Sequence, residues 1–323
     1  GGESVIDALR RAGFARPHVA AAQAEPDPDF PTVAFPNPEE PGAMDLLLEQ
    51  ATRAGADLAI ANDPDADRCA VAVPDPDSDA GWRMLRGDEV GALLATHLVH
   101  KRALGTFATT IVSSSLLSEI AAAGGVPYAE TLTGFKWLSR VEGLRYAYEE
   151  ALGYCVDPEG VRDKDGITAA LLVAELTAEL KETGRTLTEL LDDIAVEYGL
   201  HATDQLSVRV EDLSLIDAAM RRLRGTPPVS LAGLAVSSAE DLSLGTESLP
   251  PTEGLRYHLT GDPRQAVSGA RIVVRPSGTE PKLKCYLEVV VSVEDAADLD
   301  TARATADRVL AGLRADLAAA AGI

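Results

Sequence analysis

Apolar residues at helical and strand spacing alternate along the first part of the chain. They predict a helix from Ser4 to Ala12, with Ser4 as its N-cap, and an amphipathic helix over residues 43–54. A short apolar run over residues 57–61 predicts a buried strand. Residues 25–42 are rich in proline and acids, which excludes a helix or a central strand there. We therefore expect an α/β domain over residues 1–79.

The same alternation continues and predicts a second α/β domain over residues 80–197. Its helices are expected at 87–102, 116–123 and 167–183, and its strands at 107–112, 127–131 and 144–148. Asp88 and Glu89 stand at the positive end of the first of these helices, where acids are favoured. The triplet Ser113-Ser114-Ser115 follows a strand and is interpreted as its turn.

From residue 198 onward the pattern changes to strands that are joined by turns and covered by helices. The expected strands lie at 206–210, 271–274 and 284–291, and the expected helices at 213–224 and 295–320. This arrangement predicts a smaller α+β domain over residues 198–323. The predicted fold class is thus a series of mixed α/β domains followed by a smaller α+β C-terminal domain.

Composition narrows the classes of function. The chain has 323 residues, 46% of them hydrophobic, a formal net charge of −22 and a pI of about 4.6. Nucleic-acid binding requires a basic face, so we expect no nucleic-acid partner, although a few local cations could still bind phosphate. No apolar run approaches membrane-spanning length, and no signal peptide is visible, so we expect no membrane partner. The three dispersed cysteines fit reduced thiols in a cytoplasmic protein.

The run IANDPDADRCAVAV places three carboxylates, Asp63, Asp65 and Asp67, at alternate positions between two apolar stretches. Carboxylates that crowd on one side of the backbone repel one another unless a cation neutralises them, and hard oxygen ligands suit Mg²⁺. An EF-hand is excluded because Arg68 and Pro74 stand where that loop needs Gly and Glu. An acidic surface loop, or a phosphatase loop with Asp63 as nucleophile, remains an alternative.

A second motif, RPSGTEPKLKCYLE, covers residues 275–288 between two apolar strands. Its Gly278 lets the backbone approach a ligand closely, Ser277 and Thr279 offer hydroxyls and N–H groups, and Arg275 offers a planar fork suited to phosphate. The alternative is an ordinary hairpin turn, because Gly, Ser and Pro are common turn residues.

Two weaker motifs carry further candidate residues. YEEALGY ends a strand with Glu149 and Glu150, and such a pair can accept hydrogen bonds from vicinal sugar hydroxyls. TGFKW places Lys136 after a glycine turn. Surface acids and a solvated lysine are the plainer interpretations of these two motifs.

Four motifs follow one another along the chain in this order: ANDPDADR, TGFKWL, EEALGY and RPSGTEPKLK. Together they resemble the α-D-phosphohexomutase superfamily. They are most similar to the branch of phosphoglucomutases, phosphomannomutases and phosphopentomutases whose sugar loop reads EEA rather than EES. The segment PDPDFPTVAFPNPEE, residues 26–40, also resembles that branch.

The resemblance implies a mutase with one active-site loop in each of four domains. It implies Asp63, Asp65 and Asp67 as Mg²⁺ ligands. It implies that Arg68 reaches the reacting centre, that Lys136 lies near the ligand and that Glu149 holds sugar hydroxyls. It further implies that Arg275, Ser277, Gly278 and Thr279 hold the phosphate that is not being transferred. Ala151 replaces the hydroxyl-bearing Ser of other branches, so the preferred sugar phosphate stays open.

The chain departs from the superfamily in one respect: it has no Ser-His-Asn-Pro-like loop to carry a phosphoserine, and Ser113-Ser114-Ser115 lacks the flanking His and Asn. We therefore expect part of domain 2 followed by domains 3 and 4, with the missing first domain supplied by the same polypeptide. The implied substrate is a phosphosugar, and a sugar bisphosphate is the expected activator. A metal-dependent sugar phosphatase and a non-catalytic sugar-phosphate-binding protein are the alternative functions.

Overall fold

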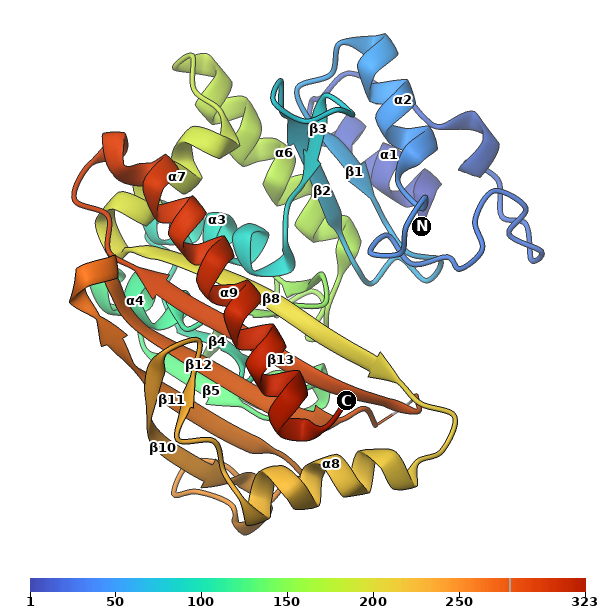
Figure 1. Cartoon of the computed structure of the whole chain (residues 1–323). Helices are drawn as coiled ribbons and strands as arrows, with labels where there is room; N and C mark the ends of the chain where they lie inside the picture. The colour runs from blue at the N-terminus through green and yellow to red at the C-terminus, as the bar shows by residue number, and fades with distance from the viewer. Residues whose placement is uncertain (279) are drawn as a thin grey trace. The chain divides into compact units, whose positions relative to one another are not determined.

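The structure is a computed structural model that describes residues 1–278 and 280–323. Its helices are α1 (Gly2–Arg11), α2 (Asp45–Ala54), α3 (Gly87–His100), α4 (Leu116–Gly124), α5 (Phe135–Leu138), α6 (Gly166–Glu182), α7 (Leu187–Tyr198), α8 (Ser214–Gly225) and α9 (Leu299–Ala321) (Figure 1). Its strands are β1 (Ala59–Ala61), β2 (Ala70–Pro74), β3 (Trp82–Met84), β4 (Thr106–Thr110), β5 (Tyr128–Thr131), β6 (Leu144–Glu149), β7 (Gly153–Cys155), β8 (Leu200–Arg209), β9 (Ser230–Leu231), β10 (Leu234–Asp241), β11 (Leu255–Asp262), β12 (Val267–Pro276) and β13 (Lys282–Val291).

The chain forms two compact units. The first comprises residues 1–110 and 117–191, and the second comprises residues 111–116 and 192–323. The short segment 111–116 therefore belongs to the second unit although the chain on either side of it belongs to the first. The predicted domain boundaries after residues 79 and 197 stay a prediction.

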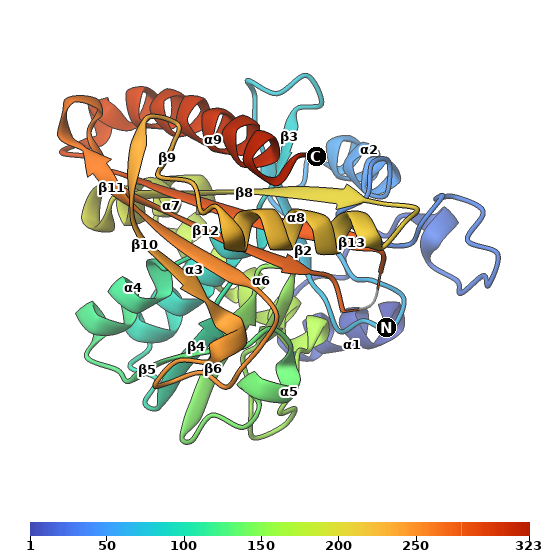
Figure 2. The same cartoon turned by 60° about the horizontal axis from the view of Figure 1, so that its bottom comes forward.

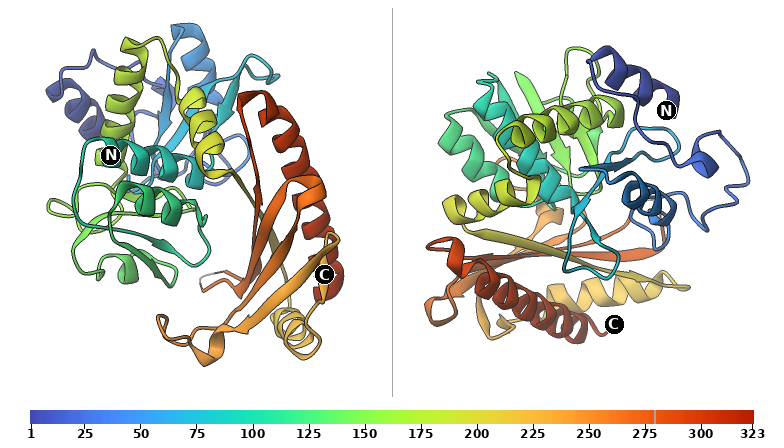
Figure 3. Two further views of the ribbon diagram at one scale, coloured as in Figure 1. Left: turned by 90° about the vertical axis from the view of Figure 1, so that its left-hand side faces the viewer. Right: turned by 90° about the horizontal axis from the view of Figure 1, so that it is seen from above.

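The first unit contains two sheets. One has the strand order β1-β2-β3, and all its pairs are antiparallel. The other has the order β5-β4-β6-β7, in which β4 pairs in parallel with β5 and β6, and β6 turns back antiparallel into β7. Helices α3 and α6 pack against each other and contact this second sheet (Figure 3). The mixed α/β architecture that the hydrophobic pattern predicts is confirmed.

The second unit is built on an antiparallel sheet with the order β8-β13-β12-β11-β10-β9. Helices α8 and α9 share one apolar core with this sheet, and Figure 2 shows both helices beside its strands. Along β13, Leu283, Cys285 and Leu287 enter that core, so the residues between them point to the opposite face. The α+β character of the C-terminal part is confirmed.

Several predicted details are wrong at the level of single residues. Helix α1 begins at Gly2 with Gly1 as its N-cap and no side-chain cap, so Ser4 lies inside the helix. Strand β4 ends at Thr110, two residues earlier than predicted, because the chain then enters the second unit. Helix α9 begins at Leu299 after a short 3₁₀ turn, Ala296–Asp298, that Asp295 caps.

No helix among the described residues combines the length and apolar character that a membrane crossing requires.

Candidate active site

The loop that carries the three aspartates connects β1 to β2 in the first unit. Its turn closes with a hydrogen bond from the Ala66 N–H to the Asp63 carbonyl (2.9 Å), and Ala66 has a positive φ of 59°. Asn62 donates from Nδ2 to the Arg68 carbonyl (2.7 Å) and so ties the two ends of the loop together. The carboxylates are thus held on a tight turn between two strands and not on a free surface loop.

The three carboxylates converge. Asp63, Asp65 and Asp67 each offer one oxygen, and these oxygens lie within 4.8 Å of one another. Asp63 is buried, Asp65 is exposed and Asp67 is intermediate, so the cluster opens to solvent on one side. Burial is the main reason that the pKa of Asp63 is raised, and the neighbouring Asp67 and Asp65 charges raise it further.

These residues fit a hard divalent cation. One oxygen of Asp67, Oδ1, is buried and has no hydrogen-bond partner among the described residues. A buried carboxylate oxygen without a donor is costly unless a cation or water satisfies it. Three carboxylate oxygens, with no histidine nitrogen or cysteine sulfur in the same cluster, are the kind of ligand set that Mg²⁺ prefers. The aspartate cluster predicted from the sequence is therefore assembled in a form suited to metal binding.

Arg68 lies against this cluster. Its Nε is 2.8 Å from Asp63 Oδ2 and 3.8 Å from Asp67 Oδ1, and its backbone N–H donates to Asp63 Oδ1 at 3.0 Å. Each oxygen of Asp63 therefore has one contact with Arg68 and keeps a further lone pair. This guanidinium neutralises part of the carboxylate charge and fixes the orientation of Asp63.

The acidic turn after β6 lies directly beside the metal loop. Glu149 pairs with Gly153 at the end of the β6–β7 hairpin, and Gly153 also bridges to Arg68. The Cys69 N–H donates to the Leu152 carbonyl at 3.0 Å. The strand that leaves the aspartate loop is thus hydrogen-bonded to the turn that carries Glu149 and Glu150.

Lys164, which the sequence motifs did not single out, completes this cluster. Its Nζ forms an ion pair with Asp67 Oδ2, and its stem approaches Gly153 together with Glu149. Burial lowers the pKa of Lys164, but the contact with Asp67 outweighs burial and raises it overall. Burial and the Glu150 charge raise the pKa of Glu149 to about 7. A half-buried acid, a lysine and three carboxylates therefore share one small region.

Gly166 allows α6 to begin next to the metal loop. Its N–H donates to the Ala66 carbonyl at 3.0 Å, and a Cβ at this position would lie 2.1 Å from the Arg68 carbonyl oxygen. The preceding Asp165 caps the helix by accepting from the Ile167 and Thr168 N–H groups. The segment that positions Lys164 is thereby fixed to the aspartate loop through its backbone.

Lys136 is placed differently. It is exposed on the short helix α5, and its Nζ lies 5.8 Å from the centre of the Trp137 ring. Among the described residues, no hydrogen bond or ion pair joins it to the aspartates, Glu149 or Lys164. The structure therefore brings together the metal loop, Arg68 and Glu149, but it does not bring Lys136 into contact with them.

The candidate phosphate-binding residues lie at the hairpin between β12 and β13 in the second unit. Arg275 pairs with Lys284 across the two strands, and both point to the face opposite the helices. The Ser277 N–H donates to the Lys282 carbonyl at 2.8 Å and closes the turn. Gly278 is exposed, and a Cβ there would meet nothing within 4 Å. Thr279 lies outside the described residues.

Positive charge gathers at this hairpin. Lys282 lies 3.1 Å from Glu280, and Arg209, opposite Lys282 on β8, lies 2.8 Å from the same glutamate. Lys282 and Arg209 thus contact one acid, and Arg275 and Lys284 add two further basic positions on β12 and β13, in a chain whose net charge is strongly negative. An anion is the ligand that this local excess of positive charge favours.

Three family models match consecutive parts of the chain. They describe the phosphoglucomutase/phosphomannomutase α/β/α domain II over residues 1–78, α/β/α domain III over residues 86–198, and the C-terminal domain over residues 261–306. The chain belongs to the phosphohexomutase superfamily.

Curated relatives within the superfamily differ in the sugar that their names imply. The "Probable phosphomannomutase" of Haemophilus influenzae is 44% identical over 96% of this chain and 60% of its own length. The phosphopentomutase of Mus musculus is 35% identical over 90% of this chain and 51% of its own length. The chain thus spans about half to three fifths of the length of these relatives.

Solved structures share the fold. A phosphoglucomutase from Paramecium, pp63/parafusin in its open form, matches with a TM-score of 0.63 at 22% identity, over 90% of this chain and 51% of its own. At this level of identity the similarity establishes the fold alone.

Proposed function

We propose that these residues form part of a phosphosugar mutase that interconverts a sugar 1-phosphate with its 6- or 5-phosphate through a sugar bisphosphate. The observation that carries this proposal is the cluster in the first unit, where the three aspartates, Arg68, Glu149 and Lys164 lie together. Relatives named as phosphomannomutase and phosphopentomutase support the same class of reaction.

In this proposal Asp63, Asp65 and Asp67 hold Mg²⁺, which supplies electrostatic stabilisation to the phosphoryl group when bound. Arg68 stabilises the negative charge of the same phosphoryl group from one side, and Lys164 stabilises it from the other. These cations act by position, because a phosphoryl group in transfer carries dispersed negative charge and needs little covalent chemistry from the protein.

The remaining residues bind the sugar. Glu149 accepts hydrogen bonds from sugar hydroxyls, and Lys136 approaches the ligand from α5. The hairpin residues Arg275, Ser277, Gly278 and Thr279 hold the phosphate that is not transferred. Binding energy from this remote phosphate is then available to orient the reacting end.

The phosphoryl donor in this proposal is a phosphoserine outside residues 1–323, because the chain contains no Ser-His-Asn-Pro loop. The serine Oγ–P bond breaks as the bond from phosphorus to a sugar oxygen forms, and the bisphosphate later returns its other phosphoryl group to the serine. A sugar bisphosphate is the expected activator. We place the protein in the cytoplasm, which suits its three free, buried cysteines.

A phosphatase with Asp63 as nucleophile fits the geometry less well. Both oxygens of Asp63 accept a hydrogen bond or an ion pair from Arg68, which lowers their nucleophilicity towards phosphorus, while each oxygen keeps a second lone pair for a metal ion. The alternative function, a non-catalytic sugar-phosphate-binding protein, would not require Mg²⁺. The hairpin between β12 and β13 could bind a phosphate without the aspartate loop.

Calorimetry with the 323-residue chain tests the proposal. We expect glucose 6-phosphate or ribose 5-phosphate to bind more tightly than the unphosphorylated sugars. Arg275→Ala should weaken phosphosugar binding about tenfold or more, because charge-assisted hydrogen bonds contribute roughly 1.5–3 kcal/mol. Arg275→Lys should recover only part of this affinity, because it keeps the charge but loses the fork.

Arg264→Ala is the matched control, since Arg264 is an exposed arginine of the same unit that pairs with Asp262. Equal affinity of wild type and Arg275→Ala would show that the hairpin is only a turn. The chain alone should not convert a sugar 1-phosphate into its isomer, and turnover by the pure chain would contradict the proposed donor.

A further inference from the structure

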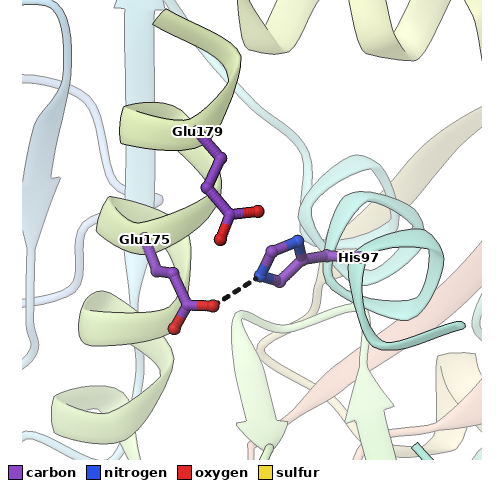
Figure 4. Close-up of side chains that lie close together, drawn as sticks. All are labelled: His97, Glu175 and Glu179. Atoms are coloured by element: carbon purple, nitrogen blue, oxygen red, sulfur yellow. Dashed lines mark hydrogen bonds and ion pairs between the residues drawn. The ribbon is translucent and has the colours of Figure 1, made fainter. Parts of the chain in front are cut away.

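A histidine and two glutamates meet between α3 and α6, away from the aspartate loop. His97 lies near the end of α3, and Glu175 and Glu179 lie one turn apart on α6, so both carboxylates project from one side of that helix (Figure 4). His97 Nε2 is 3.2 Å from Glu175 Oε1. One donor atom from each of the three residues lies within 4.8 Å of the others.

The three side chains differ in exposure in a way that suits a solvent-accessible ion site. The His97 side chain is only 3% exposed, whereas those of Glu175 and Glu179 are 43% and 47% exposed. The imidazole is therefore held in place by packing, and the carboxylates form the side that faces solvent. An ion can reach the cluster from water without opening the helix pair.

A lysine now neutralises the two glutamates. Lys101, one turn after His97, has its Nζ 3.0 Å from Glu175 Oε1 and also forms an ion pair with Glu179. Its side chain is 45% exposed, and its flexible stem can leave without disturbing the core. One ammonium balances only one of the two carboxylate charges, so a divalent cation would neutralise the cluster more completely.

We propose that His97, Glu175 and Glu179 form a second cation site, which binds an ion of the Zn²⁺ class in competition with Lys101. One nitrogen and two carboxylate oxygens, completed by water, are a ligand set that suits Zn²⁺ and its neighbours in the transition series. Ligand bonds of about 2 Å require the exposed glutamates to close in slightly on the fixed imidazole. Mg²⁺ prefers all-oxygen sites, so the two clusters select different ions.

Zn²⁺ titration of the chain by calorimetry tests this, in an Asp65→Asn background that weakens the aspartate loop. We expect one Zn²⁺ ion to bind without competition from millimolar Mg²⁺. Lys101→Met should tighten Zn²⁺ binding about tenfold or more because it removes the competing charge. Glu175→Gln and Glu179→Gln should each weaken binding by a similar factor, and both variants keep the size of a side chain that faces solvent.

Lys181→Met is the matched control, because Lys181 lies on the same helix but pairs with Asp57. It should leave Zn²⁺ affinity unchanged. Co²⁺ offers a direct readout: its visible absorption should change when His97→Gln removes the nitrogen ligand. If Lys101→Met leaves Zn²⁺ affinity unchanged, or if both glutamine variants bind like wild type, the cluster is an interhelical ion-pair network only.

Discussion

Single residues decide whether the aspartate loop and helix α6 can pack closely against each other. Gly166 donates to the Ala66 carbonyl, and the Arg68 carbonyl lies where a side chain would begin. Gly166→Ala should therefore displace α6 or the loop and weaken Mg²⁺ binding at least tenfold, and it should cost several kcal/mol of stability. Gly225→Ala, at the end of α8 where an added Cβ meets nothing within 4 Å and φ is not left-handed, is the comparison for calorimetry. Unchanged Mg²⁺ affinity in Gly166→Ala would contradict the close backbone contact.

Glu149 gives the chain a pH dependence whose sign follows from its environment. Its pKa is about 7 in the folded chain against an ordinary value of 4.5, so the folded state retains a proton that the unfolded state has lost between these values. The contribution of protonated Glu149 to the stability of the folded chain is complete below pH 4.5 and is lost as the pH rises to about 7. Glu149→Gln should raise the free energy of unfolding by about 3 kcal/mol at pH 8 and change it little at pH 4.5.

Urea denaturation of the metal-free chain at both pH values measures this. An equal gain at both would mean that hydrogen bonding, and not ionisation, distinguishes the variant from wild type.

At this scale the sequence predicted only what is local. The spacing of Asp63, Asp65 and Asp67 is visible in a short run, and the structure assembles these residues into one cluster. Lys164 was missed because it meets Asp67 from 97 positions away and its own surroundings, VRDKDG, look like a charged loop. Lys136 was predicted to lie near the ligand because of the TGFKW motif. A glycine turn before a lysine, however, does not determine where an exposed side chain lies.

Among the elements, β12 and β13 carry the buried charges of the second unit. Glu288 is 4% exposed and lies 3.0 Å from Arg271, directly across the two strands. Burial alone would raise the pKa of Glu288, but Arg271, His201 and Ser114 outweigh it and hold the pKa at about 2. The stability that Glu288 contributes is thus present above pH 4.5 and is lost as the pH falls towards 2.

Glu288→Gln should destabilise these strands by roughly 3–5 kcal/mol, because it leaves Arg271 buried without its counter-charge. Hydrogen exchange of the β12 and β13 amides would measure the loss. Glu240→Gln, which removes a more exposed partner of Arg256 on the same sheet, should cost no more than about 1 kcal/mol. Similar exchange rates in both variants would show that the Glu288 pair is as weak as a surface ion pair.

Helices and strands were predicted correctly where the hydrophobic periodicity extended over many residues. They were missed where it was short, or where a clear periodicity was overlooked. The helices α3, α4 and α6 lie within a few residues of their predicted ranges. Strand β11 was missed although LRYHL alternates apolar and polar residues as a half-buried strand does, and β10 was missed because the small residues of LAVSSAED weaken that alternation. Helix α7 was also missed, although LTELLDDIAVEY has clear helical spacing and could have been predicted from it.

At the scale of the whole molecule, the aspartate loop and the hairpin between β12 and β13 belong to different compact units. Both tryptophans, Trp82 and Trp137, lie in the first unit, so tryptophan fluorescence reports on the unfolding of that unit. Mg²⁺ at about 100 times its dissociation constant should raise the midpoint of that fluorescence transition by roughly 5–10 °C. Asp65→Asn should abolish the shift.

Calorimetric scans should then show a second transition that phosphosugar moves and Mg²⁺ does not. A single transition that both ligands shift together would mean that the units unfold as one cooperative body.

The excursion of residues 111–116 into the second unit has a practical consequence for dividing this chain. Ser114 Oγ donates to Glu288 at 2.6 Å, and the backbone N–H of Ser115 donates to the same oxygen at 2.8 Å. A C-terminal piece expressed from residue 192 would therefore lack the donors of Ser114 and Ser115 to a buried carboxylate, although it would contain all of its own sheet and helices. Fusion or gene-shuffling experiments that cut the chain between residues 191 and 192 would separate Glu288 from these serines. Residues 113–115 would therefore have to be kept together with the C-terminal half.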